Sequence, residues 1–271
     1  MQNRRGTTLV ELLVTVVVMA IVGAAMVRLM TSQSRFFSDQ EGQSNARRVA
    51  QSSLYMLFAD LRMASASGVI ATAPRGFTLD VPYRMGVSCG PDAGNSVTYM
   101  AKQPVDSIVR SDAGFTGFGY VDTLGVAHFQ AGGNQTVVSG SICMALNIDT
   151  IVGGRVVSIT PGLSSADAGL PMFVYERVRY SIDASATVPG SLGLFRRLIS
   201  AGTLEEITAP LDSTAQFRYH LAGGGAPVSV PPVGTPVVGI ELQLTGLNER
   251  NVTGGRTQKA PLWTSVFFKN R

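Results

Sequence analysis

The sequence has little of what common catalytic and metal sites require. It contains only two cysteines and two histidines in 271 residues. Cys89 and Cys143 lie too far apart for a CxxC metal or redox motif. His128 and His220 each stand in a short β-type segment among aromatic or apolar neighbours, which favours a packed or surface histidine over a catalytic one. We therefore expect a protein that is not an enzyme and that uses no metal or other cofactor.

Charge is also scarce. Charged residues make up 15% of the chain, against the roughly 25% usual for soluble domains. The mean hydropathy is +0.21, and 22 basic against 18 acidic residues give a formal charge of only +4. No long basic block occurs, so nucleic-acid binding has weak support. This composition predicts that part of the chain meets lipid.

The N-terminal end carries the clearest pattern. After MQNRRG, residues 7–27 form an apolar run that ends at Arg28. At about 1.5 Å per residue, a helix of this length matches the roughly 30 Å of hydrocarbon in a bilayer. Arg4 and Arg5 precede the run, so the positive-inside rule places residues 1–6 in the cytoplasm and everything after Arg28 outside it. The pattern predicts a single membrane span with an extracytoplasmic remainder.

Three interpretations of this run compete. A removable secretory signal has an apolar core of about 7 to 15 residues, and this run is longer and lacks a strong A-x-A-like site. A plain signal anchor explains the length and the arginines, but not Glu11, whose carboxylate costs a few kcal/mol inside lipid. In the third interpretation, cleavage after Gly6 frees the amine of Thr7, four residues before Glu11. In an assembly, the Glu11 carboxylate of one subunit can then pair with the Thr7 ammonium of a neighbour.

The segment GTTLVELLVTVVVMAIV closely resembles the class III signal of type IV prepilins and pseudopilins. The resemblance implies cleavage after Gly6 by prepilin peptidase on the cytoplasmic face, followed by N-methylation of Thr7. Major pilins usually carry Phe at the first mature position, so Thr7 is a departure from their pattern, and minor pilins are looser there.

An apolar stripe continues beyond the membrane run. It consists of residues at alternating spacings of four and three, namely Ala46, Ala50, Leu54, Leu57, Leu61 and Ala64. This spacing predicts that the helix continues to about Ser67, with a break near Gly42 and a stop at Gly68. The helix would then have a transmembrane half over residues 7–30 and an amphipathic half over residues 31–67.

Residues 68–271 read as a β-rich head, which makes the expected fold class α+β: a long N-terminal helix packed on an antiparallel head. Short β-branched and aromatic runs alternate there with Gly, Pro, Asn and Asp. The predicted strands are residues 76–81, 96–101, 107–109, 127–130, 155–159, 172–182, 193–199, 215–220, 237–245 and 261–268. They predict one antiparallel domain of one or two sheets, and the Gly- and Pro-rich residues 222–236 predict a surface loop.

The C-terminal half resembles PilW-like minor pilins and J-type pseudopilins. The similarity lies in the order of FVYERVRYSID, GLFRRLIS, LEEITAPLDSTAQFRYH, VVGIELQLTGLNER and VFFKNR, and in the helix segment ARRVAQSSLYMLFADLRMA. Residues 82–160 carry no such resemblance.

This family implies a structural subunit of the bacterial inner membrane, with its head in the periplasm and later at a filament tip. Its partners would be other minor pilins or pseudopilins, the major pilin, prepilin peptidase, the inner-membrane assembly platform and the lipid bilayer. Type IV pili and type II secretion pseudopili use the same leader and a similar head, so both remain open. The alternative is a single-pass anchored binding domain for DNA or a surface ligand.

The sequence also predicts one pairing within the head and raises the question of a second. Because the head lies outside the cytoplasm, where thiols oxidise readily, we expect Cys89 and Cys143 to form a disulfide, with two separate buried thiols as the alternative. Arg196 and Arg197 lie near Glu205 and Glu206 in the sequence. A solvated face is the favoured interpretation of these charges, and a cross-strand ionic contact is the alternative.

Overall fold

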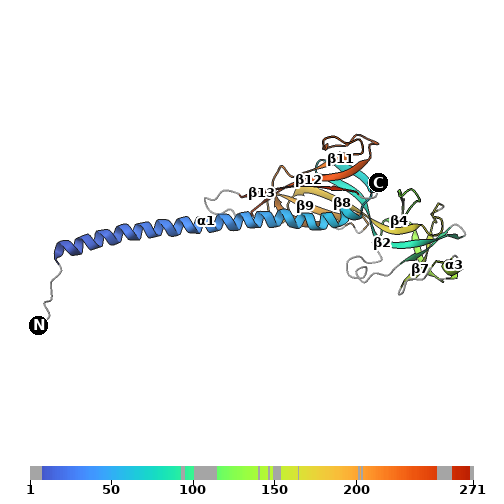
Figure 1. Cartoon of the computed structure of the whole chain (residues 1–271), viewed down its shortest axis with the longest axis horizontal. Coiled ribbons are helices and arrows are strands. Elements are labelled where there is room, and N and C mark those ends of the chain that lie inside the picture. Colours follow the sequence, from blue (N-terminus) through green and yellow to red (C-terminus); the bar gives the residue numbers. More distant parts are fainter. Residues whose placement is uncertain are drawn as a thin grey trace.

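The computed structural model describes residues 8–92, 95–100, 115–139, 141–145, 147–148, 154–163, 165–200, 202, 204–248 and 258–268. A single long helix, α1, leads into a β-rich head at its C-terminal end (Figure 1). The predicted α+β class is confirmed. The predicted strand at residues 107–109 lies outside the described residues.

Helix α1 runs without interruption from Leu9 to Met63, 55 residues or about 82 Å. The predicted break near Gly42 is wrong. Gly42 is buried against the head, where a Cβ would lie 3.2 Å from Asn248 and 3.3 Å from Gln258, so the missing side chain serves close packing. The helix also ends four residues before Ser67, because Ala64 is extended and a short 3₁₀ turn, η1 (Ala66–Gly68), follows.

The head consists of antiparallel strand pairs in one connected sheet, in the order β11-β12-β10-β9-β8-β2-β3-β7-β6. Strand β1 also pairs with β2, β13 with β12, and β4 with both β5 and β8. The elements are β1 (Val69–Ala73), β2 (Gly76–Asp92), β3 (Asn95–Met100), β4 (Gly117–Val121), β5 (Ala127–Ala131), β6 (Asn134–Val138), the short helix α3 (Ser141–Ala145), β7 (Arg155–Thr160), β8 (Pro171–Ala184), β9 (Leu192–Leu198), β10 (Leu204–Leu211), β11 (Gln216–Leu221), β12 (Val237–Leu247) and β13 (Lys259–Phe267).

Strands β2 and β8 are long enough to serve two lobes. They pair from Gly76↔Ser181 to Val87↔Pro171, with an irregularity between Pro82 and Arg84. On one side of it lies the proximal lobe, formed by β1, β9 to β13 and the adjoining halves of β2 and β8. On the other side lies the distal lobe, formed by β3 to β7, α3 and the remaining halves. The distal lobe projects beyond the C-terminal end of α1 (Figure 1).

The apolar stripe of α1 enters the proximal core as predicted. Five of its six residues are buried, and Leu54 is partly buried against the same core. Strand β12 comes close to the helix backbone at Gly246, where a Cβ would lie 2.2 Å from the carbonyl oxygen of Ala46. Any side chain at this position therefore collides with the helix backbone.

A buried charge cluster fixes the last turns of α1 to the head. Arg196 Nε of β9 donates to Asp60 Oδ2 at 2.9 Å, and the Tyr180 hydroxyl of β8 donates to the same oxygen at 2.7 Å. Burial raises the pKa of Tyr180, so the hydroxyl keeps its proton and remains a donor. Removing one charge of such a pair leaves the other buried without compensation, which typically costs about 3 to 5 kcal/mol.

This cluster corrects the sequence interpretation of Arg196. Strand register places Arg196 opposite Glu205, but its side chain is only 11% exposed and bonds to Asp60 on the helix. Glu206 turns to a loop instead, where it accepts from the Ser185 hydroxyl and from the N–H of Thr187. The solvated face is therefore wrong for Arg196.

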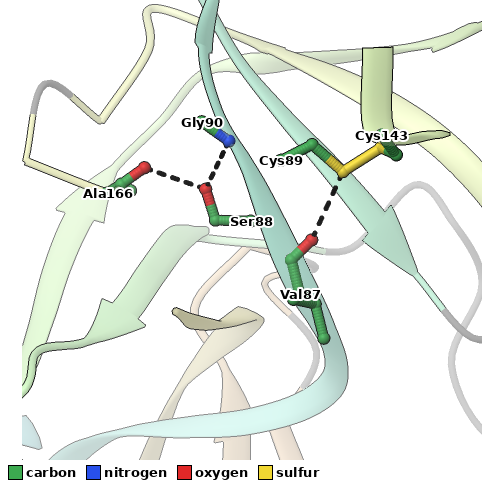
Figure 2. Close-up of a disulfide and its surroundings, with 6 residues drawn as sticks. All are labelled: Val87, Ser88, Cys89, Gly90, Cys143 and Ala166. Carbon is green, nitrogen blue, oxygen red and sulfur yellow. Dashed lines mark hydrogen bonds between the residues drawn. A yellow bond between two sulfur atoms is a disulfide. The ribbon is translucent and has the colours of Figure 1, made fainter. Parts of the chain in front are cut away.

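In the distal lobe, Cys89 of β2 and Cys143 of α3 form a disulfide with a Cα–Cα distance of 5.0 Å (Figure 2). Both cysteines are buried and pack with Val156 of β7. Beside them, Ser88 Oγ donates to the Ala166 carbonyl at 2.8 Å and accepts from the Gly90 N–H at 3.0 Å. The end of β2 is thus bonded to α3 through the disulfide and to the segment at Ala166 through Ser88.

We predict that Gly246→Ala weakens the docking of α1. The added Cβ must push against the Ala46 carbonyl, and overpacking of this kind typically costs about 1 to 3 kcal/mol. Denaturant unfolding of the full chain in detergent measures the change. Gly223→Ala is the control, because nothing lies within 4 Å of its Cβ position. Equal stability of the two variants would contradict the close approach.

We also predict that the protein, purified without reductant and then denatured, has no reactive thiol. The bridge spans a sequence separation of 54 residues, and closing such a loop stabilises by on the order of 4 kcal/mol in the chain-entropy model. Replacing both cysteines by serine should lower the denaturant midpoint accordingly. Two titratable thiols in the native protein would rule the bridge out.

Candidate functional site

The first half of α1 has no covering from the rest of the described chain. Every residue from 9 to 30 is exposed, and the most apolar window of the helix has a mean hydropathy of 2.6 with none of it buried. By length and composition, the helix can cross a membrane. Large apolar side chains left in the open in this way require either lipid or a neighbouring protein.

The helix begins at a cap that includes Glu11. Thr8 is the N-cap residue, and its Oγ1 accepts a hydrogen bond from the Glu11 N–H at 3.4 Å. The spacing Thr8-x-x-Glu11 is that of a capping box, and an acidic residue in the first turn also complements the helix dipole. Sequence reasoning identified Glu11 but missed Thr8, although the S/T-x-x-E spacing signals it.

A second described hydroxyl near this end, that of Thr15, is satisfied within the helix. Thr15 Oγ1 donates to the carbonyl oxygens of Leu12 at 2.8 Å and Glu11 at 3.0 Å. Its polarity is therefore hidden from lipid. The Glu11 carboxylate differs, because it is an exposed charge at the start of an apolar surface.

Gly6 and Thr7, the residues on either side of the predicted cleavage, lie outside the described residues, as does the whole predicted leader 1–6. Thr8, the first described residue, is the second residue after the predicted cut. The structure therefore locates Glu11 relative to the helix start, and the predicted pairing with a Thr7 amine stays a prediction.

Comparison with protein families matches residues 1–27 to the prokaryotic N-terminal methylation motif. The match covers the leader and the apolar run, a small share of the 271-residue chain. Comparisons with curated proteins and with solved structures found no match. The motif and the apolar helix together support a type IV prepilin-like protein, anchored in a membrane by one span. Such proteins interact with prepilin peptidase and with other pilins.

Both histidines lie beside polar side chains of neighbouring residues. His128 Nε2 lies 2.8 Å from Asp122 Oδ2 and its ring stacks on Tyr120. This hydrogen bond is the main reason why the pKa of Asp122 lies below its usual range. His220 Nε2 lies 3.2 Å from Ser265 Oγ. Over the residues that the structure describes, no three His, Cys, Asp or Glu side chains group to hold a metal.

A second buried ion pair lies where β2 and β8 pass between the lobes. Arg177 of β8 donates through Nε and a terminal nitrogen to the two oxygens of Asp80, at 2.8 and 2.9 Å. Burial raises the pKa of Asp80, and the guanidinium opposes that shift. The bidentate geometry holds the two strands in register at the lobe junction. The ion pairs at Asp60 and Asp80 thus join elements of the fold, and the N-terminal end of α1 is the candidate functional site.

We predict that the mature chain begins at Thr7. Cleavage there removes Arg4 and Arg5 with the leader and frees the amine that Glu11 requires. Intact-mass analysis of protein from its native host measures the start, and one added methyl group would show complete processing. Gly6→Leu should block the cut, whereas Gln2→Ala in the same leader should not. A mature chain that starts at Met1 would contradict the prediction.

Proposed function

We propose that the protein is a minor pilin or pseudopilin, a structural subunit of a tip complex that primes assembly of a type IV pilus or a type II secretion pseudopilus. The observation that best supports this proposal is that α1 is one continuous helix. The methylation motif passes without a break into a helix whose first half is bare and whose second half is locked into a folded head. In this proposal the protein is not an enzyme.

The bare half supports assembly over simple anchoring. In a helix that only anchors, the Glu11 carboxylate contributes no more than its part in the N-terminal cap, and its charge opposes insertion. Glu11 gains a use when a neighbouring subunit supplies an ammonium group. Each charge then neutralises the other in a medium of low dielectric, where the attraction is strongest.

The distal lobe supports a position at the filament tip. It lies beyond the C-terminal end of α1, on the side away from the apolar run (Figure 1). A subunit within a shaft needs space in this direction for the subunits ahead of it. A lobe that fills the space is suited to the leading end, where nothing follows.

The finer family assignment and the partners belong to the same proposal. The segments that resemble PilW-like and J-type subunits coincide, in chain order, with β8, with β9, with the pair β10 and β11, with β12 and with the end of β13. The partners would be other minor pilins or pseudopilins, the major pilin, the peptidase and the assembly platform. The head would lie in the periplasm before assembly.

Glu11→Leu tests this function. We expect cleavage, expression and head folding to stay intact, while co-purification with the other minor subunits and the number of surface filaments fall. The control is Thr15→Val, which changes a residue of the same apolar run whose hydroxyl bonds only to its own helix. Filament counts are compared in wild type, both variants and a deletion strain.

Normal filament counts in the deletion strain and in Glu11→Leu would remove the assembly role. An anchored binding domain for DNA or a surface ligand would then be the better account. Reduced counts in Glu11→Leu with normal counts in Thr15→Val support the proposal.

A further inference from the structure

The proximal lobe has an outer sheet face that the proposed function does not use. Strand β12 pairs with β11 on one side and with β13 on the other, so residues directly opposite one another point to the same face. On β12, Ile240 and Leu242 are buried in the core together with the stripe of α1. Because side chains alternate along a strand, Glu241 and Gln243 face away from the helix.

Three rows of residues make up this outer face, which we call the aromatic face. Each row holds one residue from β11, one from β12 and one from β13. In this order the rows are Gln216, Gln243 and Trp263; Arg218, Glu241 and Ser265; and His220, Gly239 and Phe267. The two large rings thus stand on β13, beside a middle strand that presents only polar side chains and a glycine.

The two rings of β13 are left in the open. Trp263, the only tryptophan in the sequence, is 73% exposed, and Phe267 is 58% exposed. Tryptophan is highly buried on average and has much area to gain from a contact. The two residues lie four positions apart on one strand, a distance of about 13 Å. A ligand that stays straight over this length can contact both rings at once.

The Phe267 ring has a defined place on the face. Gly239 leaves room for it, because a Cβ there would lie 2.8 Å from Phe267 Cδ1. The ring centroid of His220 lies 4.7 Å away on the other side of the glycine, and His220 Nε2 is 3.2 Å from Ser265 Oγ. This end of the aromatic face is therefore already ordered before a ligand arrives.

The polar side chains beside the rings also fix one another. Gln216 Nε2 donates to Gln243 Oε1 at 2.7 Å, and Gln243 Nε2 donates to Glu241 Oε1 at 3.0 Å. Arg218 lies 3.5 Å from the same carboxylate oxygen. Among the residues that the structure describes, no donor reaches Gln216 Oε1 or Glu241 Oε2. The face thus offers oriented acceptors next to bare rings.

The balance of charge and the layout of the face favour an uncharged carbohydrate. Arg218 and Glu241 neutralise each other, so the face has no net charge to attract a polyanion. A protein interface usually has an apolar centre and a polar rim, whereas this face has a polar centre and its rings on one outer strand. A sugar ring suits both parts, because its C–H face packs on an aromatic ring and its hydroxyls bond to amide and carboxylate groups.

We propose that the aromatic face binds a straight, uncharged glycan chain of β-linked sugars. One sugar ring packs on Trp263 and a later one on Phe267, while hydroxyls donate to Gln216 and Glu241. A β-1,4-linked chain is extended and spans the distance of about 13 Å, whereas an α-1,4-linked chain coils away from the second ring. This inference goes beyond the proposed function and requires neither cleavage of the leader nor Glu11.

The single tryptophan gives a direct measurement. Its fluorescence is followed in the full-length protein, in a detergent without a sugar headgroup, during titration with cellohexaose or chitohexaose, and with maltohexaose as the α-linked control. We expect a saturable change with a β-linked hexasaccharide at millimolar concentration and none with maltohexaose. No saturable change with either β-linked probe would overturn the proposal, and an equal response to maltohexaose would overturn the requirement for a straight chain.

Variants examined by titration calorimetry test the residues. Trp263→Ala should weaken binding of the responding hexasaccharide about tenfold, the size expected for the loss of one aromatic contact, and Trp263→Phe should weaken it less. Tyr55→Ala is the matched control, because it removes an aromatic side chain that is 79% exposed on α1, away from the aromatic face. Unchanged binding by Trp263→Ala, with an unchanged denaturant midpoint, would overturn the proposal.

Two further results would assign the face to another occupant. If a DNA duplex binds more weakly to Trp263→Ala than to wild type while the glycans do not bind, the ligand is a polyanion. If Trp263→Ala loses co-purification with other minor subunits while the glycans do not bind, a protein covers the face. Either result overturns this inference, whereas the Glu11→Leu experiment decides the proposed function separately.

Discussion

The structure depends on one helix that must suit two surroundings. Over its first half α1 has an apolar surface that no described part of the chain covers, and over its second half the same helix supplies a stripe to a protein core. The two halves form one continuous helix. Asp60, Arg196 and Tyr180 fix its last turns to the head, and Gly246 lets β12 approach its backbone. Without these contacts the head would be tethered to the membrane half rather than positioned by it.

The distal lobe is an extension of the same scaffold. Because β2 and β8 continue through the lobe junction, the distal strands pair with a sheet whose proximal part packs against α1. The Asp80 and Arg177 pair sits at that junction, and the disulfide closes the far end through α3. This design explains how a segment with no family resemblance, residues 82–160, adds a lobe without disturbing the helix-docked core.

The sequence predicted the elements whose signal is local. The stripe of α1 and strands β7, β8, β9 and β12 follow periodic apolar residues, and the N-terminal motif is contiguous. Strand β4 was missed because Gly117 and Gly119 weaken the strand pattern. The structure requires glycine there, since a Cβ atom would lie 2.1 Å from the Gln130 carbonyl at Gly117 and 2.4 Å from the Phe173 ring at Gly119. Arg196 was misjudged because its partner, Asp60, is 136 residues away in the sequence. Contacts of this kind leave no local trace.

The unbroken helix also links the candidate site to the placement of the head. A flexible joint at Gly42 would let each head move independently of the charges near the membrane. Since α1 continues through Gly42 and its last turns are bonded to the head at Asp60, the helix connects the position of Glu11 to that of the head without a joint. Under the proposed function, a pairing of Glu11 with a neighbouring subunit would therefore also determine where the β-rich head stands relative to that neighbour.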